Sequence, residues 1–150
     1  MEPRYSMIPH NPPESWGDCH RACVASIVEV APWEVPHIWE GYDGTEDQME
    51  VGRRNDILNN WLLDKGFILH NFYVHGTHPV EELIDNISEA NPGVYWILSG
   101  WSSNGANHAV ICRNGEVVHN PTPGSEIDGP MDDGTWLIEM LGSTVGFKEA

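Results

Sequence analysis

One stretch near the start of the chain decides the fold: Gly17-Asp18-Cys19-His20-Arg21-Ala22-Cys23-Val24-Ala25-Ser26-Ile27-Val28. Small or apolar residues recur every three or four positions from residue 19 to residue 30, which is the spacing of one buried helical face. Asp18 is a favourable N-cap, and Pro32 stops the pattern. We therefore expect the first helix over residues 19–30.

The cysteines of this stretch differ in their expected roles. Cys19 lies at the start of the helix, where unpaired N–H groups and the helix dipole favour an anion. Such a position lowers the pKa of a thiol, so we predict that Cys19 is a reactive thiolate. Cys23 lies one turn further, inside the apolar face, and Cys112 lies in an apolar strand pattern, so both are expected to be packed. Three cysteines without an export signal argue against a disulfide framework.

Length and composition limit the class of protein. A chain of 150 residues suits one domain, 1–150, with an extended arm over the Pro-rich residues 1–16. The chain has no apolar run long enough for a membrane span and does not begin like a signal peptide, so we expect a cytoplasmic protein without a membrane partner. The net charge of −16 and the lack of a basic patch argue against nucleic-acid binding, and the oligomeric state stays open.

The order of patterns along the rest of the chain predicts the fold class. The expected elements are a short helix or turn (33–40), an acidic loop (41–51), a helix (53–65), a strand (67–75), a helix (79–90), a strand (94–99), a small-residue loop (100–106), two strands (107–112 and 116–120), a loop (121–134) and a last strand (135–141). Helices gather early and antiparallel strands late, which predicts an α+β fold.

A reactive cysteine needs a base, and the base needs a third group that holds it in place. His108 is the candidate base, because it follows a loop of small residues and begins a buried strand. The partner of His108 depends on the hairpin. A two-residue loop, 114–115, would put His119 on the face of His108, whereas a three-residue loop, 113–115, would put Asn120 opposite His108. Glycine at the third loop position favours Asn120, with His119 as the second choice.

A metal site is the alternative chemistry for these residues. The side chains that could hold zinc are those of Cys19, His20, Cys23, His108 and His119. Their spacing matches neither a zinc finger nor a haem attachment motif, and there is no second cysteine pair. We therefore expect no metal and no cofactor.

Three segments together carry a resemblance to a known family. They are Asp18-Cys19-x-x-Ala22-Cys23-Val24-Ala25, Asn107-His108-Ala109-Val110-Ile111 and Val117-Val118-His119-Asn120-Pro121. The set resembles the papain-like cysteine peptidases, closest in style to bacteriocin leader-peptide peptidases and to small bacterial and phage papain-fold proteins. The resemblance implies N-terminal helices that carry the cysteine, packed on a C-terminal antiparallel sheet. It also implies Cys19 as nucleophile, His108 as base and then acid, and Asn120 as the residue that orients the imidazole.

The chain departs from this family upstream of the cysteine. Leader-peptide peptidases carry a glutamine there as an oxyanion donor, and the corresponding residue here is Pro13. The candidates for an oxyanion donor, or for a residue that supports the site, are Asn11, His20 and His119, together with the backbone N–H of Cys19. The glycine that follows the cysteine in the family is His20 in this chain.

These patterns predict a cysteine-dependent hydrolase or acyl transferase that acts on an amide or peptide bond. The substrate would be a peptide, a protein or a small amide, in a cleft lined by Trp16, Gly100 and Trp101. The resemblance places it in a bacterium or a phage-infected host cell. One alternative is a catalytically weak or inactive papain-fold binding protein, such as a phage or host interaction factor. Another is a structural α+β domain in which Cys19, His108 and Asn120 never meet.

Overall fold

The computed structural model describes residues 1–150 except positions 13, 43, 45–46 and 145–150. The elements are α1 (Cys19–Val28), the 3-10 helix η1 (Pro32–Glu34), α2 (Gln48–Asp64), β1 (Phe67–His75), α3 (Val80–Ala90), β2 (Trp96–Ser102), β3 (Asn107–Arg113), β4 (Glu116–His119), β5 (Ile127–Gly129) and β6 (Thr135–Ser143). The predicted α+β class is confirmed, because the described residues form three α-helices that pack on one antiparallel sheet.

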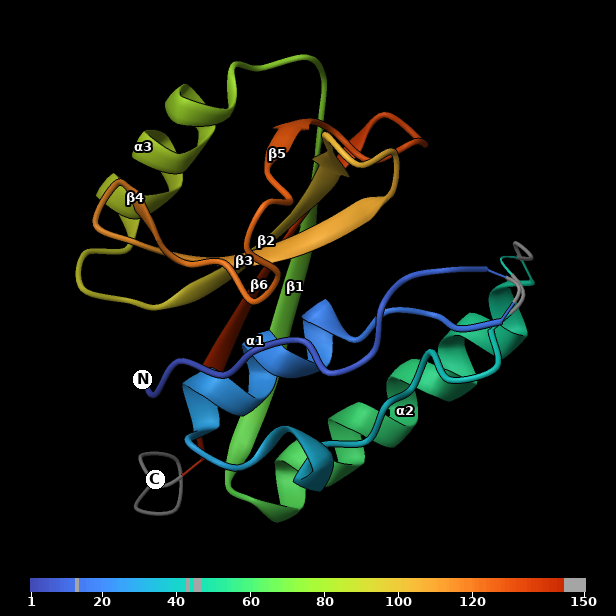
Figure 1. The fold of residues 1–150 in the computed structure, drawn as a ribbon. Coiled ribbons are helices and arrows are strands. Elements are labelled where there is room, and N and C mark those ends of the chain that lie inside the picture. The colour runs from blue at the N-terminus through green and yellow to red at the C-terminus, as the bar shows by residue number, and fades with distance from the viewer. Residues whose placement is uncertain (13, 43, 45–46, 145–150) are drawn as a thin grey trace.

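The sheet is the centre of the molecule and carries helices on both faces. Its strand order is β1-β6-β2-β3-β4, with β5 paired to β2. Helices α1 and α2 lie on one face and α3 on the other (Figure 1). Along β2, Ile97 belongs to the core beneath α1, whereas Trp96 and Leu98 belong to the core beneath α3. Because both faces are covered here, the first three residues of this strand, 96–98, are all apolar.

Helix α1 has one buried face, as its periodicity predicts, and this face packs against β3. The helix ends at Val28, earlier than expected, because Glu29 adopts the left-handed conformation with φ of 61°. The N–H of Glu29 bonds to the carbonyl of Ala25 and closes the last turn.

The first residues of the chain lie along α1 and the loop after β4. The N–H of Glu2 donates to the Ser26 carbonyl at 2.9 Å, and that of Ser6 donates to the Pro121 carbonyl at 2.8 Å. The arm therefore lies against the two elements that bear the candidate cysteine and asparagine.

Asp18 ties this arm to α1. Its carboxylate is buried and accepts hydrogen bonds from the N–H groups of Met7 and Ile8, each at 2.9 Å, and from Arg21 at 2.9 Å. Asp18 is the N-cap residue of α1, as predicted, but its side chain makes no capping hydrogen bond to the helix. The backbone of the arm competes successfully for the carboxylate.

Two regions contain more regular structure than predicted. Helix α2 begins at Gln48, within the expected acidic loop, because the Asp47 carboxylate caps the N–H groups of Met49 and Glu50. Strand β5 lies inside the expected loop 121–134, and β2 continues through Trp101. No helix in the described part of the chain combines the length and the apolar character that a bilayer crossing requires.

Candidate active site

Cys19 begins α1 and is partly buried. Burial raises the pKa of its thiol, and the charge of Asp18 adds to this shift. The backbone N–H groups of Ala109, His20 and Cys19 itself interact with the sulfur and oppose the rise. The expected low-pKa thiolate is therefore wrong for the free protein, because desolvation outweighs the favourable helix start.

His108 is held by Asn120 in a defined tautomer. The Nε2 of His108 lies 2.8 Å from the Oδ1 of Asn120. That Oδ1 also accepts from the N–H of Thr122 at 3.0 Å, while the Nδ2 of Asn120 donates to the Ser125 carbonyl. The two backbone partners fix the orientation of the amide, so Nε2 carries the proton and Nδ1 of the neutral ring is an acceptor.

The protonation of His108 suits a base. Burial lowers the pKa of the imidazole below its ordinary value of 6.5, and the hydrogen bond that its Nε2–H donates to Asn120 offsets only part of that shift. The ring is therefore neutral at pH 7, with an acceptor nitrogen available for proton transfer.

The β3–β4 hairpin closes with a two-residue turn rather than the predicted three-residue loop. Arg113 pairs with Glu116, and Asn114 and Gly115 have φ of 51° and 86°. Two successive left-handed residues are typical of the type I′ turn that Asn-Gly favours. The predicted loop of residues 113–115 is therefore wrong.

A bulge in the hairpin decides which side chain reaches His108. The register shifts between Ile111 and Cys112, so that Ile111 pairs with His119. This shift of one residue returns Asn120 to the face of His108. His119 turns to the opposite side, where its Nε2 contacts the carbonyl of Arg4. Asn120, and not His119, is therefore the neighbour of His108.

Cys19 and His108 line the same cavity, whose volume is about 790 Å³. One wall is aromatic: Trp16 and Trp39 each pack edge-to-face on Tyr42, with ring centroids 5.0 Å apart. The other walls include polar side chains of the sheet and of the loop before β3. A concave site with an apolar wall and a few converging polar groups is typical of ligand-binding pockets.

A second imidazole lies in this cavity. His20 follows Cys19, and its Nε2 lies 2.8 Å from the Oε1 of Glu139 on β6. Burial alone would lower the pKa of His20, but the charge of Glu139 and its hydrogen bond together outweigh burial and raise that pKa. His20 was predicted as a candidate supporting residue, and the structure places it in the cavity.

The structure does not bring every predicted residue to the cavity. Asn11 is exposed and forms a backbone bridge with Ser15, with both N–H···O distances at 3.1 Å. Gly100 and Trp101, predicted to line the cleft, do not line it, whereas Trp16 does. Pro13, which corresponds to the family glutamine, lies outside the described residues.

Gly100 has a packing role instead. A Cβ on this residue would lie 2.6 Å from the carbonyl oxygen of Gly129 and 2.9 Å from the Trp136 ring. Glycine is needed there because β5 lies against β2.

Sequence reasoning missed Glu139, Tyr73 and Ser125. Glu139 carried a signal, because it is the single carboxylate within the apolar run 136–141. A charged residue in such a run is almost never buried without a partner. Tyr73 and Ser125 lie in a strand and a loop without a distinguishing pattern, and only the packing places them at the cavity.

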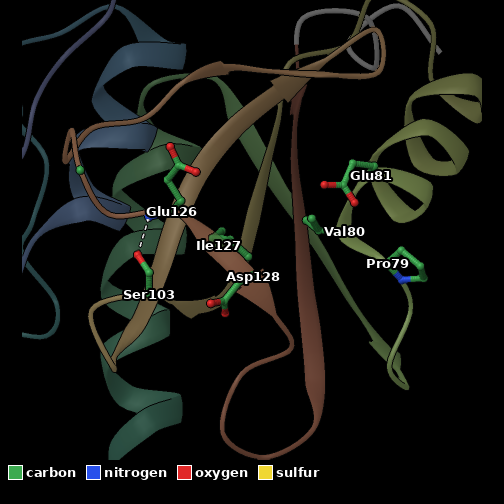
Figure 2. Close-up of a pocket in the computed structure, with 8 residues that line it drawn as sticks. Pro79, Val80, Glu81, Ser103, Glu126, Ile127 and Asp128 are labelled. Carbon is green, nitrogen blue, oxygen red and sulfur yellow. Dashed lines mark hydrogen bonds between the residues drawn. The ribbon is translucent and has the colours of Figure 1, made fainter.

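A second, more open cavity of about 570 Å³ lies between the start of α3 and the β5 region (Figure 2). It is lined by the carboxylates of Glu81, Glu126 and Asp128, and the N–H of Glu126 donates to the Ser103 hydroxyl at 3.4 Å. Its lining includes no thiol and no imidazole. Across the described positions, no three histidine, cysteine, aspartate or glutamate side chains are arranged so that they could hold a metal ion. The cavity of Cys19 is therefore the candidate active site.

Comparisons with known proteins add no assignment. A scan against protein-family models, a search of curated proteins and a search of solved structures each gave no match. The chemistry of the site is argued below from its own residues.

Proposed function

We propose that the protein is a cysteine-dependent hydrolase or acyl transferase that acts on an amide or peptide bond. One observation carries the proposal: the His108–Asn120 hydrogen bond leaves Nδ1 as the acceptor of an imidazole that lines the same cavity as Cys19. A thiol, a base and a group that orients the base are the parts that nucleophilic catalysis requires. In this proposal Cys19 is the nucleophile, His108 the general base and acid, and Asn120 the orienting residue.

The arrangement of these residues also supports a papain-like fold. Cys19 starts a helix, whereas His108 lies on a neighbouring antiparallel strand and Asn120 directly follows the next one. This is the arrangement that the resemblance to papain-like cysteine peptidases implies. Fold alone does not set activity, so the proposal rests on the site geometry.

The proposed reaction begins with proton transfer. The Nδ1 of His108 takes the thiol proton as the sulfur of Cys19 attacks the substrate carbonyl carbon. The C–N bond then breaks, and the imidazolium gives that proton to the leaving amine, which leaves a thioester on Cys19. Water attacks the thioester and gives a proton to His108, the C–S bond breaks, and the proton returns to the sulfur. An acceptor amine in place of water gives acyl transfer.

Backbone groups supply donors for the oxyanion. The N–H groups of Cys19 and His20 interact with the sulfur from the first turn of α1, where N–H groups have no partner within a helix. A preorganised donor of this kind contributes on the order of 10²–10³ in rate.

The direct test is a library of peptides and small amides, assayed by mass spectrometry on the wild type, Cys19→Ala and Cys112→Ala. We expect turnover by the wild type and by Cys112→Ala, and none by Cys19→Ala, together with an acyl adduct on Cys19. Equal turnover by Cys19→Ala and the wild type would contradict the proposal.

A binding protein without turnover is the second candidate. It is favoured by the aromatic wall of the cavity and by the raised pKa of the Cys19 thiol. A binder would hold the same peptides with equal affinity in Cys19→Ala and in the wild type, with no product in either. Calorimetry on both proteins separates the candidates.

We also propose a cytoplasmic location. All three cysteines are free thiols, which suits a reducing compartment. Two of them are buried in the cores of the sheet faces, where they behave as small apolar residues.

A further inference from the structure

The pair of His20 and Glu139 connects α1 to β6 inside the cavity of Cys19. The Glu139 side chain is only 5% exposed, and its Oε1 accepts a hydrogen bond from the Nε2–H of His20 at 2.8 Å. The His20 side chain is 18% exposed, so its ring is not closed off from the cavity. In the part of the chain that the structure describes, no hydrogen bond engages its Nδ1. The pair therefore fixes the ring and leaves one nitrogen for a ligand.

The charged and titratable groups around this pair single out His20 as a source of positive charge in the cavity. The titratable and charged side chains near it or in the cavity wall are Asp18 at the N-cap of α1, Cys19, Arg21 and Cys23 of α1, His10 of the arm, Tyr42, Tyr73 of β1, His108 of β3, Asp133 of the turn before β6, and Glu139. Arg21 is engaged by Asp18, and the described lining contains no lysine or arginine. Positive charge beside Cys19 must therefore come from an imidazole.

The environments of the two imidazoles shift their pKa values in opposite directions. Burial lowers the pKa of His108, whereas Glu139 outweighs burial and raises the pKa of His20. At any pH near neutrality, the cation is therefore a larger fraction of His20 than of His108. Two titratable groups that are pushed apart in this way divide the roles of base and charge donor.

We propose that His20, held by Glu139, is a second functional imidazole of this site, which donates an N–H and positive charge to the acyl oxygen of a substrate bound at Cys19. This inference rests on the proposed function. It gives the site a side-chain donor for the developing negative charge, alongside the backbone N–H groups. Charge-assisted donors of this kind are stronger than neutral ones.

The test compares alkylation of Cys19 by two reagents. Iodoacetamide is neutral, whereas the carboxylate of iodoacetate carries the negative charge that an acyl oxygen acquires. Rates at Cys19 are read by peptide mass spectrometry from acid to alkaline pH, at low salt. The proteins are the wild type, His20→Gln, Glu139→Gln and the double variant with both changes, which keeps a neutral amide pair. His70→Gln is the matched control, because His70 is exposed and lies outside the cavity.

We expect His20→Gln to lower the ratio of the iodoacetate rate to the iodoacetamide rate on the order of tenfold, as loss of one partly screened charge produces. In Glu139→Gln this ratio should begin to fall at a lower pH than in the wild type, because His20 then lacks the carboxylate that holds its proton. His70→Gln should leave the ratio unchanged.

If the ratio of the iodoacetate rate to the iodoacetamide rate is the same in His20→Gln as in the wild type, the inference is overturned. If that variant does not fold, the same ratio in the folded double variant overturns it equally. Failure of the proposed function looks different: His108→Ala would then leave both rates unchanged, and Cys19 would react no faster than Cys112. The ratio of the iodoacetate rate to the iodoacetamide rate therefore tests the role of His20, whereas the alkylation rates themselves test the proposed function.

Discussion

The Nε2 of His108 lies 2.8 Å from the Oδ1 of Asn120, diagonally across the β3–β4 hairpin, and a bulge between Ile111 and Cys112 makes this contact geometrically accessible. Without the bulge, the two-residue turn would bring His119 to the same face. Asn120 is fixed in turn by the backbone that follows it. The imidazole therefore has one orientation, and the predictions below depend on it.

Removing the His108 ring should slow the reaction of Cys19. We expect iodoacetamide labelling of Cys19 at neutral pH to fall in His108→Ala by about 10²-fold, within the range that general-base catalysis contributes. In the wild type the rate should rise towards alkaline pH, because the thiol pKa is raised by burial. Cys112, whose pKa burial raises to about 12, is the slow internal reference. Equal, slow labelling of all cysteines in the wild type would contradict an activated thiol.

Asn120 and His119 should differ in their effect on activity. Asn120→Ala removes the acceptor that holds His108 and leaves the Ser125 carbonyl without its side-chain donor. We expect slower labelling of Cys19 and a loss of about 1–3 kcal/mol in the free energy of unfolding. His119→Gln is the control, because His119 contacts Arg4 and not His108. A larger effect of His119→Gln than of Asn120→Ala on the labelling rate would refute the orienting role.

The two imidazoles should affect stability at opposite ends of the pH range. The folded-state pKa of His108 lies below 6.5, so its contribution is present above 6.5 and is lost as the pH falls through the folded pKa. The folded-state pKa of His20 lies above 6.5, so its contribution is present below 6.5 and is lost as the pH rises through the folded pKa.

Urea unfolding across this range checks both signs. We expect His108→Gln to remove part of the acid-side decrease in the unfolding free energy, and His20→Gln to remove part of the alkaline-side decrease. The same pH profile for both variants would show that the two environments do not differ as described.

Two glycines should respond to alanine in opposite ways. At Gly100 the new Cβ would meet backbone of Gly129 at 2.6 Å, and the strand that pairs with His108 would shift. We expect Gly100→Ala to lower the unfolding free energy by about 1–3 kcal/mol. At Gly52, inside α2, nothing lies within 4 Å, so Gly52→Ala should raise it by about 0.5–1 kcal/mol. Thermal denaturation of both variants measures the difference.

Most regular elements could be predicted because their signals are local. The strand 67–75 and the helix at 80–90 follow from periodicity and from glycine and proline at their ends. The start of α2 was placed too late because the capping signal of Asp47 was overlooked. Strand β5 was missed because three residues paired to β2 carry no periodic pattern of their own.

The candidate site was predictable in its residue types and less so in its electrostatics. Cys19, His108 and Asn120 were found from helix periodicity and hairpin pattern, although Asn120 was chosen on the wrong loop length. The thiol pKa was predicted in the wrong direction, because a helix start is visible in a sequence and the burial of the Cys19 sulfur in the folded protein is not.

By itself the sequence determined the helix that begins at Cys19, the apolar strands and the position of the turn between β3 and β4, because each depends on residues that are close along the chain. The tertiary structure decided which groups share the cavity. A bulge places Asn120 rather than His119 beside His108. Strand β6 brings Glu139 to His20, although the two residues are 119 positions apart in the chain. Contacts at such separation depend on strand order and register, and a single-residue shift reverses the face that a side chain occupies.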